Sequence, residues 1–223
     1  MTRERIENIM RKYVHNNVVG ACAGWIIEHR IKVKIKNSRS SISADYCPPF
    51  ATNGHIITIN HDLNPYAFFI IFVHEVAHLK IWLQYRESVD PHGSEWKKEY
   101  KNLMVPFLNK EIFPDDILFD LRNHLLKGAS SCCYDEKLTR SLRKHDHDYD
   151  DWILLADLLG TSTFVTKEGK KFRIEKQLRK NFRCINLDNN DIYIVPPITE
   201  VKPIYSENSN QLLTLFNDVE AGF

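Results

Sequence analysis

The sequence lacks the features that would assign it to a membrane, to secretion or to a nucleic acid by composition alone. Its longest nearly apolar run, 66–73, is far shorter than the roughly 20 residues needed to cross a bilayer. The opening segment MTRERIENIMRKYV contains no apolar stretch of the kind that a secretion signal requires. The formal net charge is only +1, which gives no overall attraction to nucleic acid or anionic lipid. We therefore expect a cytoplasmic protein with no transmembrane helix and no membrane partner.

Cysteine is scarce and poorly placed for cross-links. The five cysteines form an odd set without a CxxC pair, so at least one of them stays unpaired. Free cysteine is among the most buried residue types, and reduced thiols inside a core are the simplest interpretation. The sequence therefore predicts no disulfide framework.

What is present is the composition of an ordinary globular protein. Of its 223 residues, 43% are hydrophobic and 26% are charged, enough for one domain with a small appendage. The apolar pattern predicts an α+β fold, in which an N-terminal helix and a small sheet pack on a long central helix. Helices are expected over 2–17, 65–85, 92–104 and 115–127, strands over 30–35 and 55–60, and hairpins over 164–174 and 182–195. The composition changes beyond Pro106, and we place a boundary at Gly128, which predicts a domain at 1–128, a small β-rich module at 129–205 and a tail at 206–223.

The predicted helix after Asn64 carries the most informative motif, HEVAH. Asparagine is a good helix cap, and the proline that follows it is tolerated in the first turn. The motif comes after an apolar run, which indicates a central, buried helix. At about 100° per residue, His74 and His78 lie on one face a turn apart, and both can reach one metal ion. Glu75 lies beside the pair, where a carboxylate contacts water at the metal but not the metal itself.

This pattern is typical of zinc-dependent peptide hydrolysis. A bound zinc ion lowers the pKa of water and polarises a carbonyl, while the glutamate accepts a proton and returns it to the leaving amine. A catalytic zinc ion needs a third protein ligand and one open position. Metzincins would have glycine and histidine where this sequence has Ile81 and Gln84, so that class is excluded. The remaining candidates, His92 and Glu95, lie at the start of the next predicted helix.

HEVAH, followed by HGSEW with its histidine fourteen residues after His78, resembles the SprT-like metalloproteases, the family that includes Spartan. The similarity extends to HIITIN before the helix and, more weakly, to 130–197. It implies a zincin-like helical core with one zinc ion held by His74, His78 and His92, Glu75 as the catalytic base, and Glu95 close to the ligands but not on the metal. It also implies a metalloendopeptidase acting on protein or peptide substrates, with DNA as a further partner, because family members cut proteins attached to DNA.

The C-terminal part departs from that family. Many members end in a zinc ribbon with two cysteine pairs, whereas only Cys132, Cys133 and Cys184 fall in this part. We expect a β-hairpin module that resembles a zinc ribbon without its metal and folds on apolar residues alone. A basic run, interleaved with Phe172 and Phe182, offers candidate nucleic-acid contacts: Lys170, Lys171, Arg173, Arg179, Lys180 and Arg183. A solvated hairpin face with both rings in the core is at least as good an interpretation.

The sequence thus leaves two kinds of function open. The first is a zinc-dependent endopeptidase. The second is a non-catalytic protein that keeps the zinc site as a scaffold and binds nucleic acid or a transcription complex through the basic module. The intact Glu75 favours the first, because a purely structural site needs no base. Among residues near the motif, His61 and Tyr100 are candidates for stabilising an oxyanion, with no decisive reason for either.

Overall fold

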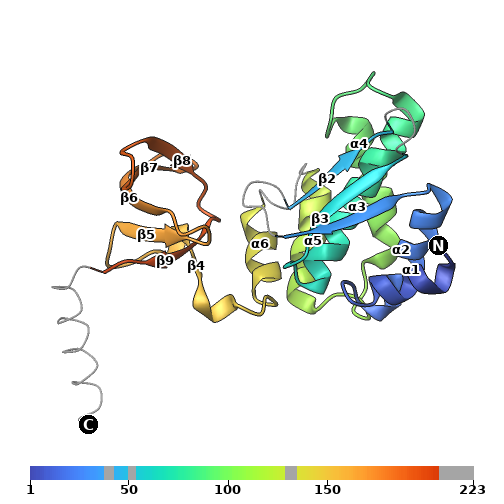
Figure 1. The fold of residues 1–223 in the computed structure, drawn as a ribbon, viewed down its shortest axis with the longest axis horizontal. Coiled ribbons are helices and arrows are strands. Elements are labelled where there is room, and N and C mark those ends of the chain that lie inside the picture. Colours follow the sequence, from blue (N-terminus) through green and yellow to red (C-terminus); the bar gives the residue numbers. More distant parts are fainter. Residues whose placement is uncertain (38–42, 50–53, 129–134, 206–223) are drawn as a thin grey trace, which may run out of the picture. The chain divides into compact units, whose positions relative to one another are not determined.

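The structure, a computed structural model, describes residues 1–37, 43–49, 54–128 and 135–205 of the chain (Figure 1). The predicted tail at 206–223 lies outside the described residues. The chain divides into two compact units, Met1–His147 and Asp148–Phe223, each with its own sheet and its own apolar core. The fold of the described part is mixed α+β, as predicted, with six α-helices and two sheets.

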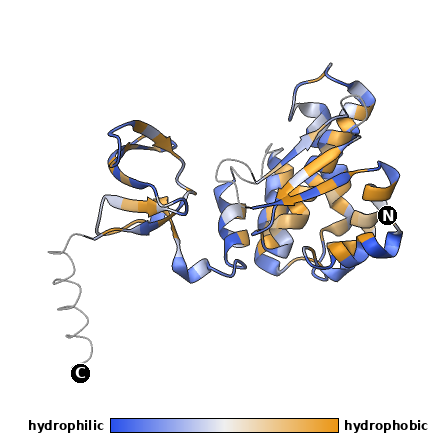
Figure 2. Ribbon diagram, viewed as in Figure 1, coloured by the Kyte–Doolittle hydropathy of each residue, from blue (hydrophilic) through white to orange (hydrophobic). Residues whose placement is uncertain are grey.

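The first unit combines a helical core with a small mixed sheet. Its helices are α1 (Arg3–Met10), α2 (Asn16–Glu28), α3 (Pro65–Tyr85), α4 (Ser94–Met104), the 3-10 turn η1 (Val105–Phe107), α5 (Asp115–Lys127) and α6 (Glu136–Arg143). Its strands are β1 (Lys32–Lys36), β2 (Ala44–Cys47) and β3 (Ile56–Asn60), in the order β1-β3-β2. β1 runs parallel to β3 and β2 antiparallel to it. Hydrophobic residues are concentrated in β3 and in the helices behind the sheet (Figure 2).

α3 is the central helix of this unit, and its bounds are those predicted from the sequence. The side-chain oxygen of Asn64 accepts hydrogen bonds from the amides of Tyr66 and Ala67, and Pro65 occupies the first turn. α3 is long and apolar enough to span a bilayer by length and hydropathy. Nevertheless, 67% of its apolar window is buried inside the protein, which is the burial expected of a core helix.

The single helix predicted over 2–17 is wrong, because the chain turns between α1 and α2. Ile6 and Met10 are buried on α1, and Val14, the next residue in the apolar pattern, is buried in the turn itself. A new helix starts after His15, whose Nδ1 accepts from the amide of Asn17 at 3.4 Å. The apolar spacing therefore continues through the turn, so the sequence pattern did not show where α1 ends.

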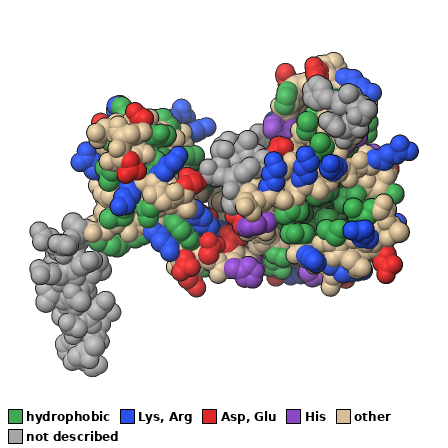
Figure 3. Space-filling model, viewed as in Figure 1, with side chains coloured by type: hydrophobic (Ala, Val, Ile, Leu, Met, Phe, Trp, Pro, Cys, Tyr) green, Lys and Arg blue, Asp and Glu red, His purple; other side chains and the backbone are tan. Residues whose placement is uncertain are grey.

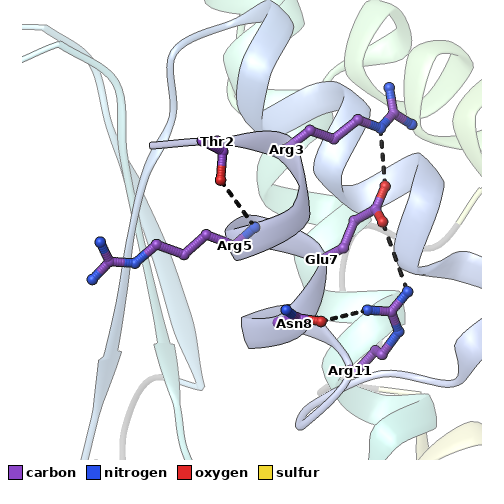
Figure 4. A network of polar contacts seen from close by, with 6 residues as sticks. All are labelled: Thr2, Arg3, Arg5, Glu7, Asn8 and Arg11. Carbon is purple, nitrogen blue, oxygen red and sulfur yellow. Dashed lines mark hydrogen bonds and ion pairs between the residues drawn. The ribbon is translucent and has the colours of Figure 1, made fainter.

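Charged side chains link successive turns of α1 on its exposed side (Figure 4). Arg3 and Arg11 contact the carboxylate of Glu7 at 2.9 and 3.7 Å, and Arg11 also donates to Asn8 at 2.7 Å. Exposed pairs of this spacing contribute about 0.5 kcal/mol or less each. The burial of the apolar face therefore contributes more to holding α1 in place.

The first unit extends past the boundary predicted at Gly128. That glycine does end α5, as a left-handed cap with φ of 60°. However, α6, which was not predicted, packs against α5, and the compact unit ends only at His147. The side-chain amide of Asn64 donates to the carbonyl of Leu142 at 2.9 Å and to the carboxylate of Asp146 at 2.7 Å. These bonds tie the end of α6 to the start of α3.

β2 was also not predicted, because Pro48, Pro49 and Gly54 indicated only turns between the two expected strands. Tyr46 of β2 pairs with Ile57 of β3, so the chain forms a strand before the prolines. Residues 50–53 lie outside the described part. The next predicted helix, expected from residue 92, begins at Ser94 as α4.

The second unit is a six-stranded antiparallel sheet in the order β4-β9-β5-β6-β7-β8. The predicted hairpins are β5–β6 and β7–β8, whereas β4 and β9 were not predicted. The strands are β4 (Ile153–Leu154), β5 (Thr163–Thr166), β6 (Lys171–Gln177), β7 (Phe182–Asn186), β8 (Ile192–Val195) and β9 (Glu200–Pro203). The 3-10 turns η3 (Tyr149–Asp151) and η4 (Leu155–Asp157) flank β4.

The core of the second unit takes up the aromatic residues of the basic run. Phe172 is only 4% exposed and stacks on Phe164 with ring centroids 5.6 Å apart, while Phe182 packs against the same cluster. Phe172 therefore lies in the core and offers no face for base stacking, whereas Phe182 is only partly buried. Cys184 is a free, buried thiol in this core. Cys132 and Cys133 lie outside the described residues, so folding of this unit without metal stays a prediction.

Candidate metal centre

α3 presents the three motif residues at the end of its apolar run. His74 and Glu75 are 9% and 6% exposed, and His78 is half-buried. The apolar residues between and beside them are fully buried: Val73, Val76 and Ala77. The two imidazoles therefore project from a helix that is fixed by packing, which is the rigid support that a precise site needs.

The chain after α3 brings His92 to the same point. Its Nε2 lies 2.9 Å from Nε2 of His78 and 3.1 Å from Nε2 of His74, and the two motif nitrogens are 3.1 Å apart. Within the described ranges, these three residues form the one group of His, Cys, Asp or Glu that could hold a metal ion. The structure thus brings together the three histidines that the sequence proposed as ligands.

The backbone between α3 and α4 explains how His92 reaches the pair. His92 has φ of 63°, in the left-handed region, which is uncommon for a residue with a side chain and costs on the order of 1 kcal/mol. The amide of Gly93 donates to the carbonyl of Asp90 at 2.9 Å. A Cβ at position 93 would lie only 3.0 Å from that carbonyl oxygen, so this tight turn favours glycine. The tight turn therefore explains why glycine follows His92 in the motif.

The three nitrogens suit a shared cation better than they suit one another. A neutral imidazole nitrogen either carries a proton or presents a lone pair. In a triangle of three such atoms, at least two of the same kind must face each other, so the three contacts of 2.9 to 3.1 Å cannot all be hydrogen bonds. A tetrahedral zinc ion with Zn–N bonds of about 2.05 Å requires nitrogens about 3.3 Å apart, close to the observed separations. The donor set therefore fits a metal ion.

Burial keeps the three imidazoles in the form that binds metal. Burial, reinforced by the neighbouring histidines, lowers the pKa of His74 to about 2. Burial together with His92 lowers the pKa of His78 to about 4. The pKa of His92 is also lowered, by burial and then by Lys97. All three side chains are therefore unprotonated at neutral pH, as metal ligation requires.

We expect the metal-free protein to lose stability as the pH falls below 6.5, the ordinary histidine pKa. The unfolded chain then binds protons that the folded chain excludes, so this stability is complete above pH 6.5. It is lost towards the folded pKa of about 4 for His78 and about 2 for His74. Each group adds a slope of up to about 1.4 kcal/mol per pH unit. Urea unfolding with chelator at several pH values measures it, and His78→Asn should flatten the slope; an unchanged slope would contradict this expectation.

Two buried aromatic side chains of α4 line the back of the histidine cluster. The Trp96 ring is fully buried, with its centroid 4.5, 5.2 and 4.7 Å from those of His74, His78 and His92. Tyr100 stacks on Trp96 at 4.9 Å. The sequence showed Trp96 only as the last letter of HGSEW, and nothing in its spacing indicated that it contacts all three imidazoles.

The two candidates for oxyanion stabilisation occupy different positions relative to the histidine cluster. Tyr100 is only 2% exposed and contacts the rings of both His74 and Trp96, so it supports the cluster from the core. His61 is exposed just beyond the end of β3 and does not belong to the metal-binding group. Neither position indicates contact with a substrate carbonyl.

Glu95, the other candidate for the third ligand, does not join the cluster. Its carboxylate accepts from the hydroxyl of Ser94 at 2.9 Å, in the first turn of α4. Hydrogen bonds from its own backbone amide and from Ser94 lower its pKa. The geometry therefore places His92, and not Glu95, beside the motif histidines.

A buried histidine on α5 lies behind this aromatic layer and was not recognised from the sequence. His124 is fully buried, and its Nδ1 lies 3.2 Å from a carboxylate oxygen of Asp135. Burial lowers the pKa of His124 despite this carboxylate, so the neutral ring donates its Nδ1 proton to Asp135. The ring also contacts Tyr100 edge-on, with centroids 6.5 Å apart. Asp135 caps α6, so the start of α6 helps to support the site.

The predicted nucleic-acid contacts belong to the second unit and are mostly solvent-exposed. Figure 3 shows Lys and Arg side chains on the visible face of this unit. Five of the predicted residues are exposed: Lys170, Lys171, Arg173, Arg179 and Lys180. Arg183 differs, because it is only half-exposed and its Nε pairs with Glu175 at 2.6 Å. The basic side chains are thus at the surface, but Phe172 is buried beneath them and cannot stack on a base.

No family model, curated protein or solved structure matches this chain. The histidine cluster, Glu75 next to His74 on α3 and the chemistry of these groups are therefore the features that bear on function.

Proposed function

We propose that the protein is a zinc-dependent metalloendopeptidase of the SprT-like type, with a zincin-like core in the first unit. The observation that carries the proposal is the convergence of three Nε2 atoms, from HEVAH and HGSEW, on one point. Structural zinc sites are closed by four ligands, usually including cysteine. Three histidines leave the fourth position of a tetrahedral ion open, which is the arrangement of catalytic zinc.

In the proposed reaction, metal binding, proton transfer and support of the ligands fall to different side chains. A zinc ion held by His74, His78 and His92 would polarise the scissile carbonyl and lower the pKa of water at the open position to about 7. Glu75, next to His74 on α3, would accept a proton from the attacking water and deliver it to the leaving amine. Trp96 would keep the imidazole rings oriented and exclude water from their rear side.

The second unit is proposed as a hairpin module that resembles a zinc ribbon without its metal and brings DNA-associated proteins to the site. Its exposed lysines and arginines support contact with phosphate groups. A non-catalytic nucleic-acid-binding protein would use the same surface. Glu75, buried in the turn between the two motif histidines, favours the peptidase over this alternative.

Chelation and zinc re-addition test the proposed activity. We expect the purified protein to cleave an unfolded substrate such as casein, to lose this activity in EDTA, and to regain it with zinc but not with magnesium. The assay should include single-stranded DNA in a parallel series, because the substrate is proposed to be DNA-associated. Cleavage that persists without metal, or no cleavage by the zinc-loaded protein with or without DNA, would contradict the proposal.

A further inference from the structure

An apolar cavity in the first unit plays no part in the proposed chemistry. It has a volume of about 280 Å³ and lies where the end of α4 and η1 meet α5. This volume is close to the lower limit of about 300 Å³ for ligand pockets. The lining surface is almost entirely apolar, and the residues that contribute to it are Lys101, Val105, Leu108, Arg122, Leu125 and Leu126.

Exposed apolar side chains extend this surface beyond the cavity. Val105 and Leu126 are 51% and 73% exposed, and Phe119 on α5 is 66% exposed. Phe119, Arg122 and Leu126 are spaced so that they share one face of α5. The apolar surface is therefore an elongated strip along a helix, with the cavity at one end.

The two cations at the cavity have no ion-pair partner among the residues that the structure describes. Lys101 is exposed, and one Nη of Arg122 donates to the carbonyl of Leu108 at 2.9 Å, which leaves other guanidinium donors available. The carboxylates of α5 contact other groups. Asp115 pairs with Lys110 and Asp116 lies against His145. Asp120 accepts a hydrogen bond from Ser141. The strip is therefore apolar, and the two cations at its edge form no ion pair within the described residues.

We propose that this strip docks an acidic amphipathic helix of a partner protein. An apolar side chain of that helix enters the cavity, and its carboxylates face Lys101 and Arg122. A small anionic amphiphile would fill the cavity but leave Phe119 uncovered, whereas a helix laid along α5 covers the whole strip. Charge complementarity selects an acidic partner over a basic one. This inference is independent of the metal centre.

Fluorescence anisotropy with a labelled synthetic helix, leucine on one face and glutamate on the other, tests the proposal. We expect the full-length protein to bind this helix, and Leu126→Asp or Lys101→Glu to weaken binding at least tenfold. The same helix with lysine in place of glutamate should bind wild type poorly and Lys101→Glu better. Circular dichroism verifies that each variant is folded.

Two matched substitutions control for nonspecific effects. Arg5→Glu reverses a charge on α1, where the arginine side chain extends away from the network in Figure 4. Ile27→Asp places a carboxylate at another apolar side chain, 43% exposed, on α2. Both variants should bind the acidic helix as wild type does. No binding to wild type, equal weakening by the controls, or equal binding of the lysine helix would overturn the proposal.

Discussion

Replacing Glu75 with glutamine is expected to remove peptide hydrolysis while leaving the metal in place. Glutamine keeps the shape of the side chain but cannot accept a proton, and general bases contribute about 100- to 10,000-fold to rate. Because the proposed ligand atoms belong to His74, His78 and His92, zinc content should not change. Cleavage of casein and of a DNA-bound protein, together with zinc per chain, measures both effects.

The matched control for this substitution is Glu87→Gln, an exposed glutamate in the segment between α3 and α4. It should retain full activity and full zinc. If Glu75→Gln cleaves as fast as wild type, Glu75 is not the base. If wild type is as inactive as Glu75→Gln on both substrates, the peptidase proposal fails and the non-catalytic alternative remains.

Removing the third imidazole is expected to have the largest effect on metal binding. His92→Ala leaves only two nitrogens at the cluster, and we expect zinc affinity to fall by more than the roughly 100-fold that loss of a supporting contact costs. Glu95→Ala changes a residue close to the same turn, but the Glu95 side chain contacts Ser94 and not the histidines. This variant should therefore keep its zinc. Titration with a chromophoric zinc chelator compares the two variants with wild type.

The outcome that would overturn the ligand assignment is retained zinc in His92→Ala with loss of zinc in Glu95→Ala. Thermal unfolding of each metal-free variant shows whether the turn has been disturbed. Alanine at position 92 would have to adopt the same left-handed backbone, with φ of 63°. Any strain at this residue is therefore carried over, and the comparison reports on the imidazole.

The parts of the site that were predictable are those encoded locally. A cap at Asn64, a proline and an apolar run define α3, and helical geometry then places His74 beside His78. The position of His92 follows from a turn of the chain, so spacing alone left His92 and Glu95 as equally good candidates for the third metal ligand. Only the resemblance of HGSEW to a known motif selected it from the sequence.

The parts that were missed depend on tertiary contacts. Trp96 reaches three imidazoles only when α4 packs against α3. His124 finds its carboxylate on α6, after a glycine that ends a helix but not the domain. The buried Val14 continued the apolar pattern of α1 through a turn, so the helix predicted over 2–17 ran past the end of α1 to the start of α2. In each case the structure depends on contacts between elements of the fold, which the pattern along the chain does not reveal.

The basic module shows the same limit for strands. Alternation predicted the β5–β6 hairpin but not which face of it is buried. The register places Phe172 opposite Phe164 on the core side, so the neighbouring Lys171 and Arg173 point to solvent. A shift of one residue would have exchanged the two faces, and only the packed sheet fixes the choice.

The most direct test of the central claim is the location of bound zinc. The measurement is an anomalous difference map at the zinc absorption edge, from crystals of protein purified without chelator. The expected result is one peak per chain, within bonding distance of Nε2 of His74, His78 and His92. No peak at these three nitrogens in zinc-loaded crystals, or a peak held by other residues, would contradict the metal centre and the chemistry proposed for it.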